Sequence, residues 1–290
     1  MDTSLLEAFV TAAEAESFSA AADRLHLTQS AVSKRIALLE QQLDCRLFDR
    51  IARTVSLTSS GRELLPRARS ILGELQATRQ AIADLSGSVS GTLRLAISHH
   101  IGLRRLPKVL KRFTREFPDV SIDMAFMDSE SAYDNILHGH FELAIITLSP
   151  KPHPKVIAQS IWPDELAFVV APDHPLTETP FAVEQLQNYP AILPELNTHT
   201  SQIVTELFAT QHLKLNTAMT TNYLETIKAM VAIGMGWSLL PLSMLDNTVT
   251  ALPANDLKLE RQLGYIHHKE KTLSNAARAL IDMLEKQASG

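Results

Sequence analysis

The stretch over residues 17–43 constrains the fold most, because its pattern marks two short helices joined by a tight turn. Ser17 supplies a hydroxyl cap for the first of these helices, and Thr28 can cap the second. A further amphipathic helix, over about 4–15, precedes them and carries apolar residues at helical spacing. The sequence therefore predicts a compact bundle of three helices.

The predicted helix over 29–43 has two chemically different faces. At about 100° per residue, Val32, Ile36 and Leu39 fall within about 60° of one another and are expected to pack inward. The opposite side carries Ser30, Ser33, Lys34 and the small Ala37, and Gln29 is exposed at the N-terminal end, so this face is short, polar and basic. Such a face fits a DNA major groove, because glutamine can pair with adenine, lysine with phosphate or guanine, and serine with either. The pattern favours a helix-turn-helix, and a small solvated bundle that binds no DNA is the alternative.

Two short alternating segments follow this helix and predict a β-hairpin. They span residues 46–50 and 55–58, so that Arg53 is expected at the hairpin tip. A wing of this kind can reach a minor groove or the neighbouring backbone. We expect phosphate contacts from Lys34, Arg50 and Arg53, so that affinity for DNA falls with salt. The whole chain carries a formal charge of -5, which excludes a uniformly basic nucleic-acid coat.

The N-terminal residues carry motifs whose spacing is unbroken over about 60 positions: Phe18-Ser19-Ala20-Ala21-Ala22, Thr28-Gln29-Ser30-Ala31-Val32-Ser33, Leu47-Phe48-Asp49-Arg50 and Leu57-Thr58-Ser59-Ser60-Gly61. This segment resembles the LysR-type transcriptional regulators. The resemblance implies that Gln29, Ser30, Ser33, Lys34 and Arg53 contact DNA. The sequence departs from the family at Ser30, where proline is frequent, and at Asp44, where glycine is usual. Since aspartate tolerates left-handed backbone better than most residues, the turn at Asp44 is expected to survive.

The next segment, over 60–88, predicts a linker helix that pairs with another helix. Its inward positions, apolar except for Thr78, recur in steps of four and three, at Leu64, Ala68, Ile71, Leu75, Thr78, Ile82 and Leu85. A 3.5-residue repeat is the period of a left-handed coiled coil. Packing within one subunit is the alternative at this point. The resemblance implies that the helix joins two subunits, and that the homodimer further assembles into a homotetramer.

Beyond Gly91, strands and helices alternate, which predicts parallel α/β sheets. The resemblance implies an effector-binding domain like a periplasmic binding protein, with a cleft between two subdomains. The expected organisation is a winged helix-turn-helix over 1–59, the linker helix over 60–88 and the effector domain over 89–290. Within that domain we expect subdomain one at about 92–161 and 267–290, and subdomain two at about 162–266.

Polar side chains stand where ligands bind in open α/β sheets, beyond the carboxyl ends of strands and near helix N-termini. This rule selects Ser98, His99, His100 and Thr147 from subdomain one, and Thr198, His199, Thr200 and Asn222 from subdomain two. Hydroxyls and N–H groups at helix starts favour anions, so the expected effector is a small carboxylate or another anion. The alternative is that each residue is an ordinary helix cap or loop polar group. Their meeting in one cleft is implied by the resemblance alone.

The remaining sequence features predict no catalytic residue, metal or cofactor. The close pairs among the eleven histidines lack the spacing of metal ligands, and no Gly-x-Ser-x-Gly elbow is present. The single cysteine, Cys45, fits a reducing cytoplasm, and no apolar run reaches the roughly 18 residues of a membrane span. We therefore expect a cytoplasmic regulator that binds double-stranded DNA and a small molecule. A solute-binding or enzymatic α/β protein with a helical N-terminus that binds no DNA is the alternative.

Overall fold

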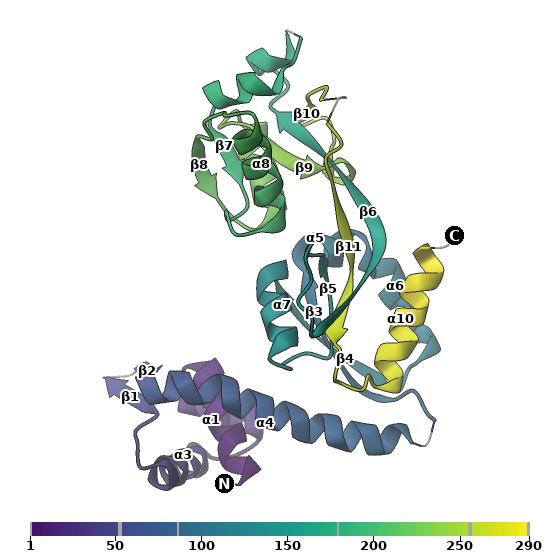
Figure 1. The fold of residues 1–290 in the computed structure, drawn as a ribbon. Helices are drawn as coiled ribbons and strands as arrows, with labels where there is room; N and C mark the ends of the chain where they lie inside the picture. The colour runs from purple at the N-terminus through teal and green to yellow at the C-terminus, as the bar shows by residue number, and fades with distance from the viewer. Residues whose placement is uncertain (1, 52–53, 86, 179, 255–256, 289–290) are drawn as a thin grey trace. The chain divides into compact units, whose positions relative to one another are not determined.

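The computed structural model describes residues 2–51, 54–85, 87–178, 180–254 and 257–288 (Figure 1). The chain forms two compact units, and each is described by itself. The first comprises Met1–Ser86 with His138–His140, and the second comprises Gly87–Leu137 with Phe141–Gly290. The residue limits predicted for the domains and subdomains stay predictions.

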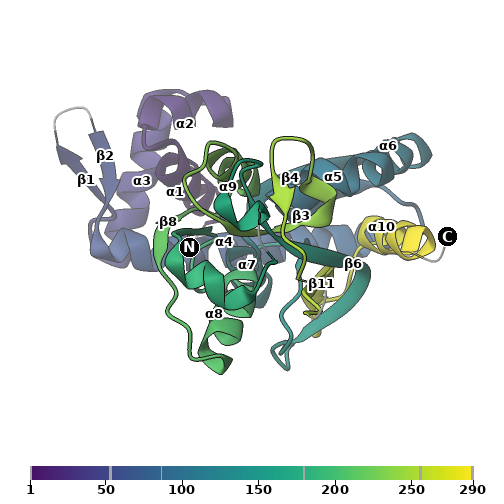
Figure 2. The ribbon, with the colours of Figure 1, turned by 90° about the horizontal axis from the view of Figure 1, so that it is seen from above.

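The first unit contains the predicted helices and hairpin. Its elements are α1 (Thr3–Ala15), α2 (Phe18–Leu25), α3 (Gln29–Leu43), β1 (Phe48–Ile51), β2 (Thr54–Leu57) and α4 (Ser59–Asp84). The hydroxyls of Ser17 and Thr28 cap α2 and α3 by accepting backbone N–H groups, as predicted. Asp44 ends α3 in the left-handed region with φ 49°, so this turn survives without glycine. The antiparallel hairpin of β1 and β2 projects from the edge of the helical bundle (Figure 2).

The residues behind the outer face of α3 pack in the core or fix the hairpin. Val32, Ile36 and Leu39 are fully buried, which confirms the inward face of α3. The Phe48 ring packs at 5.3–5.4 Å from two other phenylalanine rings of the bundle core. A carboxylate oxygen of Glu40 accepts the backbone N–H of Leu47 at 2.7 Å and so fixes the start of the hairpin to α3. These contacts hold the outer face of α3 in place.

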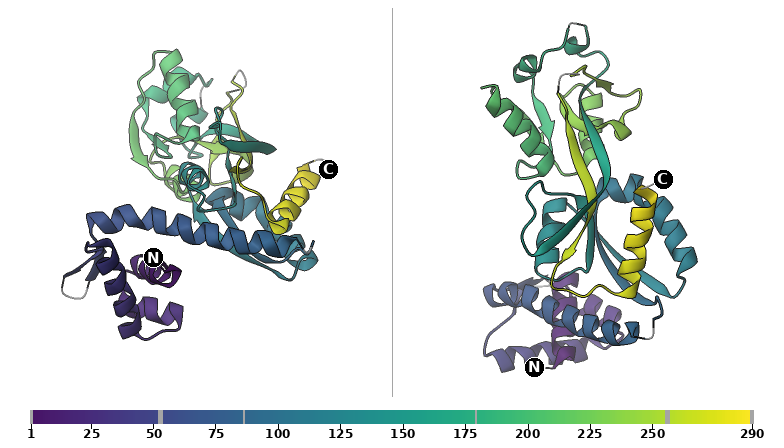
Figure 3. Two further views of the ribbon diagram at one scale, coloured as in Figure 1. Left: turned by 60° about the horizontal axis from the view of Figure 1, so that its bottom comes forward. Right: turned by 45° about the vertical axis from the view of Figure 1, so that its right-hand side comes forward.

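The long helix α4 packs on α1 only through its first half. Ala68 is fully buried in the bundle core, and Arg69 forms an ion pair with Glu14 of α1 at 2.9 Å. Beyond this point α4 extends past the bundle (Figure 3, left). Three apolar residues of the predicted repeat are exposed there, with exposed fractions of 43% for Ile71, 67% for Ile82 and 85% for Leu85, whereas Leu75 is half-buried. The second half of the predicted seam therefore has little apolar cover within its own unit.

The second unit is built on a mixed sheet. In the described part of the chain this sheet has seven strands, ordered β10-β6-β11-β5-β3-β4 with β9 paired to β6. The strands are β3 (Gly91–Ser98), β4 (Val120–Met127), β5 (Leu143–Thr147), β6 (Val156–Val170), β9 (Ser238–Pro241), β10 (Thr250–Ala251) and β11 (Glu260–His268). The predicted parallel pairing holds between β3 and its neighbours β4 and β5. The predicted parallel pairing is wrong for β6 and β11, which run antiparallel to each other. The strand β6 is also antiparallel to β9 and β10, and β11 is antiparallel to β5.

Helices cover both faces of the strands β3, β5 and β11. They are α5 (His99–Arg104), α6 (Leu106–Glu116), α7 (Ser129–Leu137) and α10 (Asn275–Ala288). Leu95 and Ile97 of β3 pack against α6 and α10, whereas Ala96 between them packs against α7. Two of these helices, α5 and α6, are consecutive in the chain, because it breaks at Arg105 before Pro107. These elements form one subdomain.

The other subdomain surrounds a small parallel pair, β7 (Ala191–Leu193) and β8 (Thr217–Thr220), with helices α8 (His199–Thr210) and α9 (Leu224–Ala232). Its core centres on Trp237, which is fully buried against Phe168 and Phe208. The strands β6 and β11 lie side by side and connect the two subdomains (Figure 3, right). The residues over 156–165 of β6 pair with β11, and the residues over 166–170 pair with β9 and β10.

Candidate functional site

The outer face of α3 presents the side chains predicted to contact DNA. Gln29, Ser30 and Lys34 are exposed, and Ser33 is half-buried. The amide Nε2 of Gln29 donates to the hydroxyl of Ser33 at 3.1 Å, and the hydroxyls of Ser30 and Thr28 lie 3.0 Å apart. The first turn of α3 therefore presents a row of hydrogen-bonding groups to solvent.

Two further residues, Arg50 and Arg53, are predicted to contact DNA. The backbone of Arg50 pairs with Val55 in the hairpin. The side chain of Arg50 and the whole of Arg53 lie outside the described residues. Their roles stay predictions.

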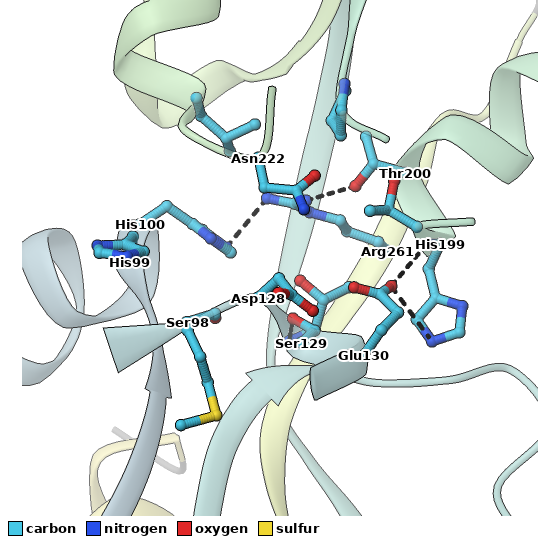
Figure 4. A pocket seen from close by; sticks show the side chains of 15 residues that line it. Ser98, His99, His100, Asp128, Ser129, Glu130, His199, Thr200, Asn222 and Arg261 are labelled. Carbon is cyan, nitrogen blue, oxygen red and sulfur yellow. Dashed lines mark hydrogen bonds and ion pairs between the residues drawn. The ribbon is translucent and has the colours of Figure 1, made fainter. Parts of the chain in front are cut away.

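The second unit contains a small cavity of about 50 Å³ that all eight predicted effector residues line (Figure 4). They are Ser98, His99, His100, Thr147, Thr198, His199, Thr200 and Asn222. Each stands at the end of a strand or the start of a helix, as expected. The cavity is also lined by residues that the sequence analysis missed, among them Asp128, Ser129, Glu130 and Arg261.

Arg261 of β11 is the central charged group of this cavity. Its side chain is only 5% exposed and makes three interactions. The guanidinium donates from Nε to Asp164 at 2.9 Å and from Nη1 to the hydroxyl of Thr200 at 2.6 Å. Its Nη2 lies 3.0 Å from Nε2 of His100. Figure 4 shows the side chain reaching between His100 and Thr200, which belong to different subdomains.

The electrostatic environment of Arg261 keeps its neighbour His100 uncharged. Burial, followed by the positive charge of Arg261, holds the pKa of His100 well below its usual value. A neutral imidazole accepts the N–H of Arg261 through Nε2. Burial also lowers the pKa of Arg261, and the negative charge of Asp164 opposes this effect. The guanidinium therefore stays charged in a buried site.

A carboxylate from subdomain one contacts the first turn of α8 in subdomain two. Oε1 of Glu130 accepts the backbone N–H of His199 at 3.0 Å and lies 3.9 Å from Nε2 of the same residue. Glu130 therefore occupies part of the positive end of α8. The neighbouring Asp128 caps its own helix α7 through the backbone N–H and hydroxyl of Ser131.

Two buried polar atoms of the cavity lining have no hydrogen-bond partner within the described residues. They are the hydroxyl of Ser98, a residue 4% exposed, and Nδ1 of His199. Leaving such a group unsatisfied costs about 1–3 kcal/mol. The Ser98 hydroxyl does not cap α5, although Ser98 occupies the capping position. It is thus free to contact a ligand.

Other predicted effector residues use their polar atoms within the protein. The hydroxyl of Thr198 caps α8 by accepting the N–H of Ser201, and Oδ1 of Asn222 accepts the N–H of Glu195. The backbone N–H of Thr147 donates to the hydroxyl of Ser129 at 3.1 Å. The geometry of these groups fits the alternative that they are helix caps and loop contacts.

A larger cavity of about 450 Å³ adjoins the first and shares His199 and Arg261 with it. Ile203, Leu148 and two prolines line it together with polar groups. The described residues include no group of three or more histidine, cysteine, aspartate or glutamate side chains placed to hold a metal ion. None of the helices in the described ranges combines the length and hydrophobicity that crossing a bilayer requires.

Comparison with known proteins agrees with both parts of this architecture. Residues 3–62 match the model of the bacterial regulatory helix-turn-helix proteins of the lysR family. Residues 86–289 match the model of the LysR substrate binding domain. The chain is 31% identical over 282 residues to the HTH-type transcriptional regulator YeiE of Escherichia coli strain K12, covering 96% of this chain and 94% of that protein.

Solved structures share the same fold at lower sequence identity. The LysR family regulator CbnR is similar with a TM-score of 0.71 and 20% identity, covering 99% of both chains. The effector binding domain of QuiR, solved in complex with shikimate, is similar with a TM-score of 0.63 and 20% identity, covering 69% of this chain and 98% of that one. The chain belongs to the LysR family of transcriptional regulators, with a DNA-binding helix-turn-helix followed by a ligand-binding effector domain.

Proposed function

We propose that the effector of this regulator is a small anion, such as a carboxylate, bound in the cavity around Arg261. The observation that carries the proposal is a buried guanidinium that lines the same cavity as the unpartnered hydroxyl of Ser98. Arg261 uses one N–H of each terminal nitrogen on Thr200 and His100, which leaves the second N–H of each for a ligand. Guanidinium groups and hydroxyls are the usual partners of carboxylates. The complex of QuiR with shikimate, which bears a carboxylate, supports the same class of ligand.

The effector is expected to act by a population shift between arrangements of the two subdomains. Arg261 contacts Thr200 on one side and His100 on the other, so a ligand held by Arg261 favours one arrangement. We expect the protein to bind its effector without transforming it, and the match to families of transcriptional regulators supports this expectation. The family assignment does not support the alternative of a solute-binding or enzymatic α/β protein with a helical N-terminus that binds no DNA.

On the DNA side, Gln29, Ser30, Ser33 and Lys34 are expected to read the major groove, with Arg50 and Arg53 on the backbone or minor groove. The exposed apolar residues of α4 support a homodimer joined through that helix, as the 3.5-residue repeat predicts. Two dimers would form the homotetramer. A regulator of bacterial genes acts where the chromosome lies, so we place it in the cytoplasm.

A thermal-shift screen of the full-length protein tests the effector proposal. The screen uses small carboxylates, sulfur oxyanions and amino acids, because a ligand of the native state raises the melting temperature. Ser98→Ala and Thr200→Ala are each expected to abolish the shift that a binding compound produces. Ser121→Ala, an exposed serine of β4, is the matched control and keeps the shift. Retention of the full shift in both cavity variants would contradict the assignment.

A mobility-shift assay tests the DNA contacts. The double variant Gln29→Ala with Arg53→Ala is expected to lose sequence-specific retention of operator DNA. Lys111→Ala removes an exposed positive charge from α6 and serves as the control, which binds like the wild type. Unchanged retention in the double variant would remove these residues from the interface.

A further inference from the structure

The cavity around Arg261 is electrically divided, with positive charge at one end and negative charge at the other. At the positive end, Arg261 and Arg105 flank one carboxylate, Asp164, at 2.9 and 3.9 Å. One buried carboxylate thus faces two guanidinium groups. The unpartnered hydroxyl of Ser98 and the spare N–H groups of Arg261 also line the cavity and can donate to a negatively charged oxygen.

The other end of the cavity carries two carboxylates, Asp128 and Glu130. Both oxygens of Asp128 are used by Ser131, but only Oε1 of Glu130 is engaged, by His199. In the described part of the chain, Oε2 of Glu130 accepts no hydrogen bond. Figure 4 shows Glu130 and Asp128 on the opposite side of the cavity from Asn222, with Arg261 between them. Glu130 therefore has one acceptor oxygen available beside the ligand position.

A simple anion meets an unfavourable charge balance in this cavity. The charged side chains of its lining are one guanidinium and two carboxylates, and the guanidinium is already paired with Asp164. The negative charge of Glu130 also favours the charged form of Arg261 and so reaches the position of a carboxylate held by Arg261. A ligand that brings its own positive charge to the Glu130 end removes this repulsion.

We infer that the effector is a zwitterion of the α-amino acid type, with its carboxylate at Arg261 and Ser98 and its ammonium at Glu130. This inference rests on the proposed anion site and adds the second charge. The cavity of about 50 Å³ suits the few heavy atoms of an amino-acid head group. Oε2 of Glu130 accepts from the ammonium while Oε1 keeps the N–H of His199.

Isothermal titration of the full-length protein with matched ligands tests the inference. The probes are the standard L-amino acids, the corresponding acids without the amino group, and the corresponding amines without the carboxylate. At least one amino acid is expected to bind at least tenfold more tightly than both of its matched partners. If an acid lacking the amino group binds as tightly, the zwitterion is wrong and the anion site stands. If a matched amine binds as tightly, both proposals are overturned. If none of the three classes binds, the zwitterion is overturned, and the thermal-shift screen with sulfur oxyanions decides whether the anion site stands.

The variant Glu130→Gln separates recognition of the ammonium from a structural role. Glutamine keeps an oxygen for the N–H of His199, removes the negative charge and replaces the second acceptor oxygen with an amide NH2 group that donates. Amino-acid affinity is expected to fall at least tenfold, while affinity for the matched acid without the amino group stays equal or rises. Glu184→Gln, an exposed residue outside the cavity, is the control and binds like the wild type. Equal losses for both ligand classes in Glu130→Gln would show a structural role alone and overturn the inference.

Discussion

Arg261 and Asp164 lie directly opposite each other on the paired strands β11 and β6, with 2.9 Å between Nε and Oδ2. They are 97 residues apart in the chain, and their side chains are 5% and 3% exposed. The strand register itself brings the two charges together. The ion pair therefore orients the guanidinium before any ligand arrives.

The ion pair predicts a specific pattern of stability losses. Asp164→Ala is expected to lower the free energy of unfolding of the effector domain by about 3–5 kcal/mol, because it leaves a buried cation without its partner. Urea unfolding followed by fluorescence measures this loss, since both tryptophans, Trp162 and Trp237, are buried in the second unit. Asp173→Asn, an exposed change, should stay within about 0.5 kcal/mol. If the double variant Asp164→Leu with Arg261→Met is less stable than Asp164→Ala, an unpartnered buried cation is not the cause of the loss.

The buried imidazole of His100 predicts how stability depends on pH. Its pKa in the folded state is well below 6.5, the value for an exposed histidine, because of burial and Arg261. Below pH 6.5 the unfolded chain takes up a proton that the folded chain does not, so acid favours unfolding. The free energy of unfolding should fall by about 1.4 kcal/mol per pH unit for this one group. Urea unfolding between pH 7 and 5.5 measures the slope.

The slope can be assigned to His100 by substitution. His100→Gln keeps an acceptor for Arg261 and should make the dependence shallower by about one proton. His153→Gln, at an exposed position, is the control and should leave the slope unchanged. An unchanged slope in His100→Gln would place the proton uptake elsewhere, for instance on His174 or His267, whose pKa values are also lowered.

Lys34 predicts the salt dependence of DNA binding. Lys34→Ala should weaken binding to operator and non-operator DNA alike and reduce the slope of log affinity against log salt by about one, because one phosphate contact is lost. Fluorescence anisotropy at several salt concentrations measures both quantities. Lys214→Ala, an exposed lysine of the second unit, should change neither. Loss of operator binding alone, with the slope kept, would assign Lys34 to base recognition instead.

The exposed repeat of α4 predicts a dimer interface. Ile71→Glu should raise the dissociation constant of the dimer at least tenfold, because it places a charge in an apolar seam, and should leave the helical content nearly unchanged. Sedimentation velocity and circular dichroism measure these quantities. Gln76→Glu, exposed on the same helix but off the repeat, is the control. A dimer that tolerates Ile71→Glu must be held by another surface.

The N-terminal fold could be predicted closely because its signals are local. Caps at Ser17 and Thr28 and the apolar spacing of α3 define the helix limits to within a few residues. Asp44 adopts the left-handed turn that its side chain allows. The grouping of the eight candidate effector residues in one cavity could be predicted because one topological rule applies to the strand ends and helix starts, and their role in binding stays a prediction.

Arg261 could not be predicted from local pattern. It stands inside a strand between two polar residues, and its burial depends on Asp164, which lies in a distant part of the sequence. An uninterrupted apolar run marks only the second part of β6, over 166–170, since Pro163, Asp164 and Glu165 interrupt the apolar pattern before it. Those polar residues are accommodated by pairing with β11, a tertiary interaction. Glu130 did have a signal, because it follows β4 in the same way that Ser98 ends β3.

The paired strands β6 and β11 run from one subdomain into the other, and Arg261 lies where β6 exchanges one set of partners for another. Because its two strands are hydrogen-bonded to each other, this connection is stiffer than one made of loop residues alone. At the proposed effector site, a ligand held by Arg261 would therefore bind next to the connection between the two subdomains. We expect occupancy of this small cavity to favour one orientation of the two subdomains over another.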